Sequence, residues 1–129
     1  EQYRLTNQIK FIDQCEDMAL AYHVSDIVVS ASIEPEAFGR VAVEAQSMEK
    51  LIIASNIGGS NETIVDEKTG LLFEAGDANS LSQKIIRAIT MDERSIKILG
   101  IEGRKNVKKK FNVEKMCFST YSEYKRLVN

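Results

Sequence analysis

The sequence predicts an α/β domain in which a parallel sheet is flanked by helices and is followed by a helical C-terminus. Short apolar, β-branched runs at residues 26–31, 51–55 and 71–73 alternate with segments of helical period. Strands separated by helices favour right-handed βαβ units, which place the strands parallel in one sheet. From residue 77 onward the pattern is helical to the end of the chain.

The first elements in chain order are a strand, a helix and a second strand. Residues 8–13 alternate polar and apolar side chains, which is typical of a half-buried strand. Residues 15–22 have a short helical pattern, and residues 26–31 are suited to a buried parallel strand. We therefore expect the sheet to begin near residue 8.

Residues 32–64 change character three times and hold the densest group of polar side chains. A polar loop is followed by apolar or small residues at i, i+3, i+4 and i+7, which predict a helix with one face against the sheet. That face consists of Phe38, Val41, Ala42, Ala45 and Met48. A strand at residues 51–55, a turn at Gly58 and Gly59, and a short helix near residues 60–65 come next.

The C-terminal half is predicted to form three helices. Asp77 is suited to cap the first, and the second runs from about Asp92 toward residue 110. Gly100 and Gly103 lie on one face of the second helix, and because glycine weakens a helix, they indicate close packing against a neighbour. Asn112 is expected to cap the last helix.

Composition describes one small globular domain of 129 residues with a net charge of −2. That charge argues against a general nucleic-acid binder, which needs clustered lysine and arginine. Cys15 and Cys117 are interpreted as free thiols because two distant cysteines form no disulfide framework. We found no apolar run of about 18 residues and no leader pattern, so a cytoplasmic location is expected. The chain begins at Glu1, which suggests a fragment.

The polar loop and the helix after it form a candidate anion or sugar site. The first amides of this helix, near Phe38, Gly39 and Arg40, have no intrahelical acceptor, and the positive end of the helix dipole lies there. Such a site suits phosphate or sugar hydroxyls. Glu36 precedes the helix and Glu44 lies two turns into it, so the two acids can hold different parts of one ligand.

The residues alone leave a second interpretation open. Glu36 can simply stabilise the N-terminus of a helix, which contributes about 0.3–1 kcal/mol. Glu44 can pair with Arg40 four residues earlier, a contact that contributes about 0.2–0.5 kcal/mol. In that interpretation neither acid touches a ligand.

The pattern Glu36-Ala-Phe-Gly-Arg-Val-Ala-Val-Glu44, followed by Gly58-Gly-Ser-Asn-Glu62, resembles the donor-binding signature of the family 4 (group 1) retaining glycosyltransferases. These are nucleotide-sugar enzymes of the GT-B fold, and the resemblance covers most of the chain. It implies that residues 1–129 are a single domain, the C-terminal donor-binding domain with a Rossmann-like parallel sheet, truncated on its N-terminal side. The missing N-terminal domain is then a partner.

The resemblance also assigns roles at the sugar end of the donor. Glu36 is the implied catalytic residue, which hydrogen-bonds hexose hydroxyls beside the reacting anomeric carbon. The backbone N–H groups of Phe38 and Gly39 assist it, and Ser32 lines the loop beneath the sugar.

At the nucleotide end, the resemblance places Arg40 near the donor phosphates and gives both ribose hydroxyls to Glu44. Gly58 and Gly59 let the next loop pass close to the ligand. No metal and no cofactor other than the donor itself, linked to UDP, GDP or ADP, is implied.

The function implied by this resemblance is transfer of a hexose from a nucleotide-sugar to a glycan or lipid-linked acceptor with retention, as in polysaccharide or lipopolysaccharide biosynthesis. This chain supplies the donor-binding half and is expected to be inactive alone. The alternative is a non-catalytic nucleotide-sugar-binding or interaction module, and a third option is a sugar-phosphate synthase or an epimerase. Basic residues at 104–110 are explained by a solvated helix face, or by a peripheral contact with the inner face of the membrane.

Two positions depart from the family pattern, which usually has glycine in place of Glu49 and proline in place of Leu51. Glycine at the first position would end the helix in a left-handed turn, so we expect Glu49 to be slightly strained.

The resemblance implies a sheet of strand order 3-2-1-4-5-6, of which this chain holds only the third to the sixth strand. The strands at residues 8–13 and 26–31 are not neighbours in that order. We therefore expect either that the first strand moves beside the second, or that a homodimer forms through the exposed edge.

Overall fold

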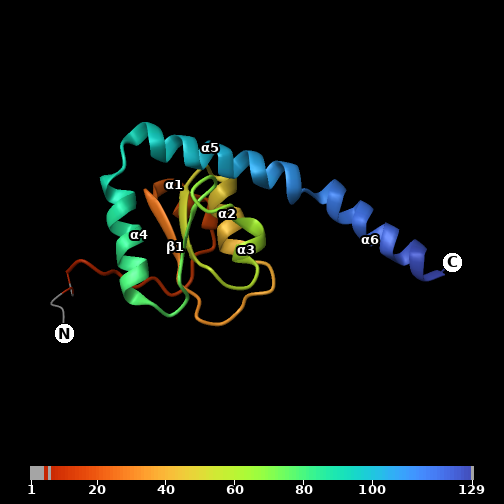
Figure 1. The fold of residues 1–129 in the computed structure, drawn as a ribbon, viewed down its shortest axis with the longest axis horizontal. Helices are drawn as coiled ribbons and strands as arrows, with labels where there is room; N and C mark the ends of the chain where they lie inside the picture. The colour runs from red at the N-terminus through yellow and green to blue at the C-terminus, as the bar shows by residue number, and fades with distance from the viewer. Residues whose placement is uncertain (1–4, 6, 129) are drawn as a thin grey trace.

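The computed structural model describes residue 5 and residues 7–128. Helices and strands alternate along the chain as far as residue 73, and helices alone follow (Figure 1). The elements in order are α1 (Met18–Val24), β1 (Ile27–Ser30), α2 (Arg40–Ser47), β2 (Leu51–Ser55), α3 (Ser60–Thr63), β3 (Leu71–Phe73), α4 (Ala78–Thr90), α5 (Glu93–Lys110) and α6 (Val113–Val128).

The strands form one parallel sheet in the order β1-β2-β3. Ile27 of β1 pairs with Leu51, and Ile53 of β2 pairs with Leu71. The predicted strands at residues 51–55 and 71–73 have the same bounds as β2 and β3. The predicted α/β class, with a parallel sheet, flanking helices and a helical C-terminus, is confirmed.

The core lies on both faces of β2, whose residues are all buried. Successive side chains of a strand point to opposite faces of the sheet. Ile52 and Ala54 accordingly pack with residues of α1 and α2, whereas Leu51 and Ile53 pack with residues of α4 and α5. Figure 1 shows α4 and α2 on opposite sides of the sheet and α5 crossing above it.

The two glycines of α5 allow this crossing. A Cβ atom at Gly100 would lie 2.1 Å from the carbonyl oxygen of Glu49, and one at Gly103 would lie 3.0 Å from Cγ of Gln46. The predicted close packing against a neighbour is therefore confirmed, and the neighbour is the C-terminal end of α2.

Helix α2 ends in a left-handed turn at Glu49, whose φ is 57°. The N–H of Lys50 donates to the carbonyl of Ala45 at 3.0 Å, and the N–H of Glu49 donates to that of Gln46 at 3.0 Å. These two bonds form a Schellman motif, in which the left-handed residue is usually glycine. The left-handed turn expected at Glu49 is confirmed, and the strain stored there stays a prediction.

The start of α2 differs from the prediction. Phe38 was expected on the face of α2 that packs on the sheet, but the helix begins at Arg40 and the Phe38 side chain is exposed. Gly39 has a φ of 73°, and this left-handed residue separates Phe38 from the helix. The Phe38 ring instead meets that of Phe111 edge-on, with centroids 5.4 Å apart.

The strand predicted at residues 8–13 is wrong. Ile9 donates its N–H to the carbonyl of Leu5 in a turn, and the residues after it have no regular structure. The Phe11 side chain is 90% exposed. A strand needs a neighbour for its backbone groups, and this segment joins no ladder, since β1 pairs only with β2 within the described residues.

The alternative in which the first strand moves beside residues 26–31 is therefore also wrong. β1 forms an edge of the sheet in the described part of the chain. Pairing of that edge with a second copy stays a prediction.

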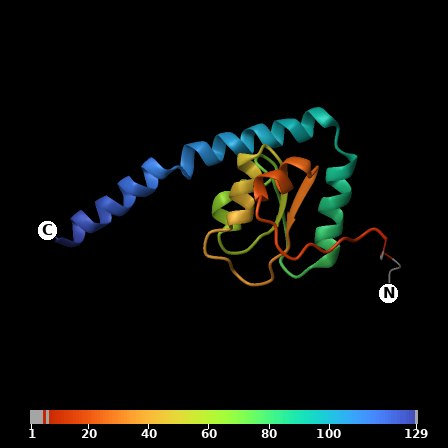
Figure 2. The ribbon, with the colours of Figure 1, turned by 180° about the vertical axis from the view of Figure 1, so that it is seen from behind.

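The C-terminal helices are capped as predicted. Asp77 accepts from the N–H groups of Asn79 and Ser80, and Asn112 accepts from the N–H of Lys115 at 2.9 Å. Helix α6 projects away from the rest of the fold (Figure 2), and none of its described residues is buried. Of the helices described here, none has the length and apolar character needed to cross a membrane.

Candidate functional site

The predicted site residues lie in the segments that follow the carboxyl ends of β1 and β2. Residues 31–39 connect β1 to α2, and residues 56–59 connect β2 to α3. In open parallel α/β sheets, the crevice outside the carboxyl ends of the strands is the usual place for a ligand. All eight predicted residues come from the first segment, the second segment and the first two turns of α2.

Glu36 lies in the first segment and is exposed. The hydroxyl of Ser32 donates to its Oε1 in a short hydrogen bond. The carbonyl of Glu36 accepts the N–H of Gly59 at 2.8 Å, so the backbone of the two segments is joined at this residue. The structure thus brings Ser32, Glu36 and the glycine turn together, while their roles toward a ligand stay a prediction.

The glycine turn packs directly on the backbone of the first segment. A Cβ atom at Gly58 would lie 2.6 Å from the carbonyl oxygen of Glu36, and one at Gly59 would lie 2.3 Å from the carbonyl carbon of Phe38. Gly58 also has a φ of 57°, a backbone conformation that residues other than glycine rarely adopt. Contact between the two segments therefore requires glycine at both positions, whatever ligand they hold.

A second group of polar side chains lies along α2. Nη2 of Arg40 is 3.0 Å from Oε1 of Glu44, and Nε of Arg40 donates to the same oxygen at 3.3 Å. The ion pair that the residues alone left open is therefore present. Its arginine side chain is 82% exposed and its glutamate side chain 35%, so both remain open to solvent.

The other oxygen of Glu44 is held by a residue that the sequence did not assign to the site. The hydroxyl of Tyr22, in α1, donates to Oε2 of Glu44 at 2.9 Å. Tyr22 is only 5% exposed. Burial, the hydrogen bond to Glu44 and the negative charge of that carboxylate raise the pKa of Tyr22 to about 12. Tyr22 is therefore a neutral donor at every physiological pH.

The backbone at the start of α2 completes the arrangement. The hydrogen bonds of α2 begin at Ala42 and Val43, whose N–H groups donate to the carbonyl of Gly39. The N–H groups that precede Ala42 in the helix have no intrahelical acceptor. These groups and the positive end of the helix dipole favour an anion. The arrangement presents a carboxylate at Glu36, a cation at Arg40 and a second carboxylate at Glu44.

A family model, described as Glycosyl transferases group 1, matches residues 1–109. This chain belongs to that family. The matched part contains every predicted site residue together with Tyr22, and α6 lies beyond it.

Known glycosyltransferases and a solved glycosyltransferase structure resemble the chain over most of its length. The capsular polysaccharide biosynthesis glycosyltransferase CapM of Staphylococcus aureus is 34% identical over 110 residues, which make up 79% of this chain and 29% of that protein. A crystal structure of a glycosyltransferase from Rickettsia africae has a TM-score of 0.92 at 37% identity, covering 99% of this chain and 34% of that chain.

A third comparison concerns a structure with a bound nucleotide-sugar. The crystal structure of Anabaena HepE in complex with UDP-glucose has a TM-score of 0.84 at 27% identity, covering 92% of this chain and 33% of that chain. The group 1 chain described here therefore spans about a third of these proteins. The likenesses confirm the predicted family and the predicted partial GT-B fold.

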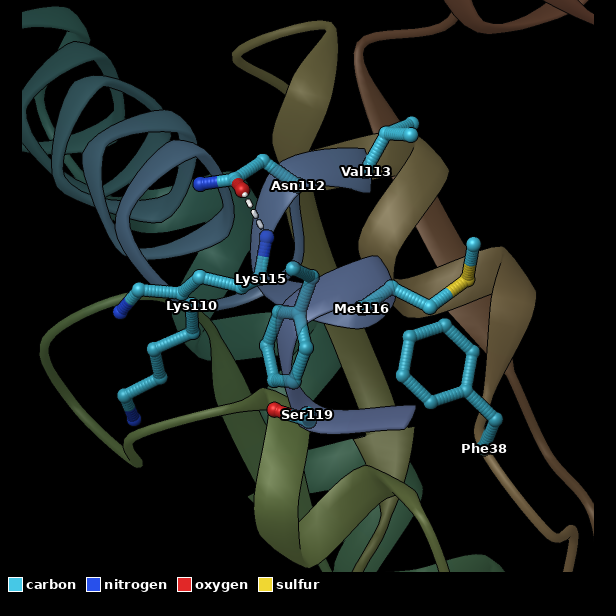
Figure 3. A pocket seen from close by; sticks show the side chains of 8 residues that line it. Phe38, Lys110, Asn112, Val113, Lys115, Met116 and Ser119 are labelled. Carbon is cyan, nitrogen blue, oxygen red and sulfur yellow. Dashed lines mark hydrogen bonds between the residues drawn. The ribbon is translucent and has the colours of Figure 1, made fainter. Parts of the chain in front are cut away.

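An apolar groove that the sequence did not predict lies between the segment of residues 31–39 and helix α6. It has a volume of about 550 Å³. Phe38 and Met116 lie beside each other in it, and Lys110 and Lys115 lie at its side (Figure 3). Phe111 lies between α5 and α6 and contributes its ring, so the groove depends on how the two helices meet.

Proposed function

We propose that this chain is the donor-binding part of a retaining glycosyltransferase that transfers a hexose from a nucleotide-sugar to a glycan or lipid-linked acceptor. The observation that carries this proposal is the grouping of Glu36, Arg40 and Glu44 around the start of α2, at the carboxyl ends of the strands. Group 1 membership and the likeness to a structure solved with UDP-glucose support it.

At the sugar end, Glu36 is proposed to accept hydrogen bonds from hexose hydroxyls beside the anomeric carbon. The hydroxyl of Ser32 already donates to one of its oxygens, which limits the rotation of the carboxylate. A carboxylate accepts about four hydrogen bonds, so positions remain for the sugar. The N–H groups of Phe38 and Gly39 are proposed to contact the same ligand.

At the nucleotide end, Glu44 is proposed to accept both ribose hydroxyls, and Arg40 to lie near the phosphates. Oε2 of Glu44 accepts from Tyr22, which leaves about one acceptor position on that oxygen. Oε1 accepts from Nε and Nη2 of the exposed Arg40, so a ribose hydroxyl at Oε1 has to replace one of these N–H groups. The exposed guanidinium of Arg40 and the N-terminal end of α2 provide positive charge for the departing diphosphate.

The chemistry that this arrangement supports is electrostatic. As the bond to the leaving diphosphate breaks, positive charge develops at the anomeric carbon and negative charge on the phosphate oxygens. Glu36 stabilises the first, and Arg40 with the amides of α2 stabilises the second. We propose no metal and no cofactor besides the donor, and transfer with retention at the anomeric carbon.

The remaining parts of the proposal concern the longer protein. The chain spans 29% of the length of CapM, so the acceptor site and an N-terminal domain are proposed to come from elsewhere in the molecule. A cytoplasmic location, at the inner face of the membrane, is proposed with them, as is a role in polysaccharide or lipopolysaccharide synthesis.

Calorimetric titration of the chain with UDP, GDP, ADP and their hexose conjugates tests the donor site. We expect saturable binding of one nucleotide series, weakened about 10-fold or more by Glu44→Ala, because hydrogen bonds to charged groups contribute about 1.5–3 kcal/mol. Glu123→Ala, on exposed α6, is the matched control and should bind like the natural chain. Absence of binding to every nucleotide would overturn the proposal.

The second candidate is a donor-binding module without turnover, because Glu36 and the Arg40–Glu44 pair can bind a donor without transferring its sugar. A transfer assay separates the two. Release of the nucleotide from the bound donor in the presence of acceptor would exclude the non-catalytic module, and tight binding without release from a longer chain that includes the N-terminal domain would support it.

A further inference from the structure

The structure assigns to Tyr22 the role of a positioning residue, which holds the Glu44 carboxylate in the orientation that accepts a ribose diol. This inference rests on the proposed function and adds to it a determinant of selectivity for ribonucleotides. Its basis is the hydrogen bond of 2.9 Å from the Tyr22 hydroxyl to Oε2 of Glu44, made from inside the hydrophobic core.

The two protein partners of Glu44 differ in rigidity. Arg40 holds Oε1 from a side chain that is 82% exposed, and exposed ion pairs of this kind are weak and mobile. Tyr22 is 5% exposed, and its ring packs in the cluster that contains Ala42 and Ala45 of the same helix. The buried ring is held by its neighbours, so of the two partners that the described residues supply, Tyr22 gives the carboxylate the fixed reference point.

Accepting a diol places a geometric demand on the carboxylate. A carboxylate accepts two neighbouring hydroxyls in a bidentate manner when both oxygens turn toward them, and a free glutamate side chain loses rotamer freedom when it is held there. Tyr22 occupies one acceptor position of Oε2 and limits this rotation before the nucleotide arrives. Pre-organisation of this kind increases affinity without an added contact to the ligand.

The inference predicts that the Tyr22 hydroxyl matters only to ligands that carry a ribose diol. Tyr22→Phe keeps the ring and removes the hydroxyl. We expect it to weaken binding of the preferred nucleoside diphosphate about 10-fold, and binding of the 2′,3′-dideoxy form less than about 2-fold. Tyr121→Phe, at an exposed position on α6, is the matched control and should change neither.

A double-mutant cycle tests whether Tyr22 acts through Glu44. In a Glu44→Gln background, Tyr22→Phe should have little further effect, because the carboxylate that it positions is gone. Equal losses for the ribose and dideoxy ligands, or additive losses in the cycle, would show a general structural role and overturn the inference. If the natural chain binds no nucleotide at all, the proposed function and this inference both fail.

A second measurement covers the case in which Tyr22→Phe does not fold. The chain is prepared with 3-fluorotyrosine, and the ¹⁹F resonance of Tyr22 is assigned by replacing the other tyrosines one at a time. Addition of the ribonucleotide should shift this resonance, whereas the dideoxy form at equal saturation should not. A resonance that responds identically to both ligands would contradict the inference.

Discussion

Replacing Glu49 by glycine should stabilise the chain, although it removes a side chain and an ion pair. Glu49 has a φ of 57° in the turn that ends α2. A residue other than glycine loses about 1–2 kcal/mol in the left-handed region, whereas glycine adopts it freely. The greater freedom of glycine in the unfolded chain offsets about 0.4–1 kcal/mol of the gain.

The ion pair contributes little to the balance. Nη1 of Arg104 is 3.4 Å from Oε1 of Glu49, and both side chains are more than two-fifths exposed. Such pairs contribute about 0–1 kcal/mol. From the middle of these ranges, the net expectation for Glu49→Gly is a gain of about 0.3 kcal/mol in the free energy of unfolding, seen as a rise of about 1–2 °C in Tm.

Glu49→Ala is the control, because it removes the same ion pair and keeps a side chain in the left-handed turn. We expect it to be as stable as the natural chain or slightly less stable. Urea unfolding followed by circular dichroism gives both values with one protocol. A glycine variant no more stable than the alanine variant would refute the argument that backbone strain is stored at this turn.

Three further predictions concern α5, Tyr22 and the basic end of α5. Gly100→Ala should lower the free energy of unfolding by about 1–3 kcal/mol in urea, because the added Cβ would lie 2.1 Å from the carbonyl oxygen of Glu49. The control Glu102→Ala, on the exposed face of α5, should change the free energy of unfolding by less than about 0.5 kcal/mol. The pKa of Tyr22 is raised to about 12 in the folded chain, so its contribution to the free energy of unfolding is complete below about pH 10 and is lost as the pH rises from there toward 12. We expect the free energy of unfolding to fall by about 1–2 kcal/mol over that range, and to fall less in Tyr22→Phe. Vesicles containing anionic lipid should bind the chain at low salt and bind it less at high salt. Replacing the three lysines at 108–110 by glutamine should weaken the binding further. Binding that persists at high salt would argue against an electrostatic contact.

Much of the fold follows from local patterns in the sequence. The bounds of β2 and β3 agree with apolar runs that stop at polar or glycine residues, and Asp77 and Asn112 act as the helix caps that their positions predict. Gly100 is found where two elements come within contact distance, as expected of a glycine on an inner face. The strand bounds and the helix caps depend on residues close to one another in the chain, whereas Gly100 predicts a close neighbour without identifying Glu49, 51 positions away.

The features that the sequence did not predict depend on distant contacts. Residues 8–13 alternate in the manner of a strand but have no neighbouring strand to pair with. Phe38 fits the helical period of α2, yet it lies outside the helix and its ring contacts Phe111, 73 positions away. The bond from Tyr22 to Glu44 joins residues 22 positions apart, and nothing in either local pattern indicates it.

The contact between the glycine turn and the segment before α2 has a mechanical consequence. No side chain separates Gly58 and Gly59 from the backbone of Glu36 and Phe38, and a hydrogen bond of 2.8 Å ties the two loops together. Neither loop can shift without displacing the other, so we expect the two loops to move together as one rigid unit. A ligand that contacts Glu36 alone would then also reduce the motion of the loop after β2. Hydrogen exchange at the amide of Gly59 would become slower, although the ligand does not contact Gly59.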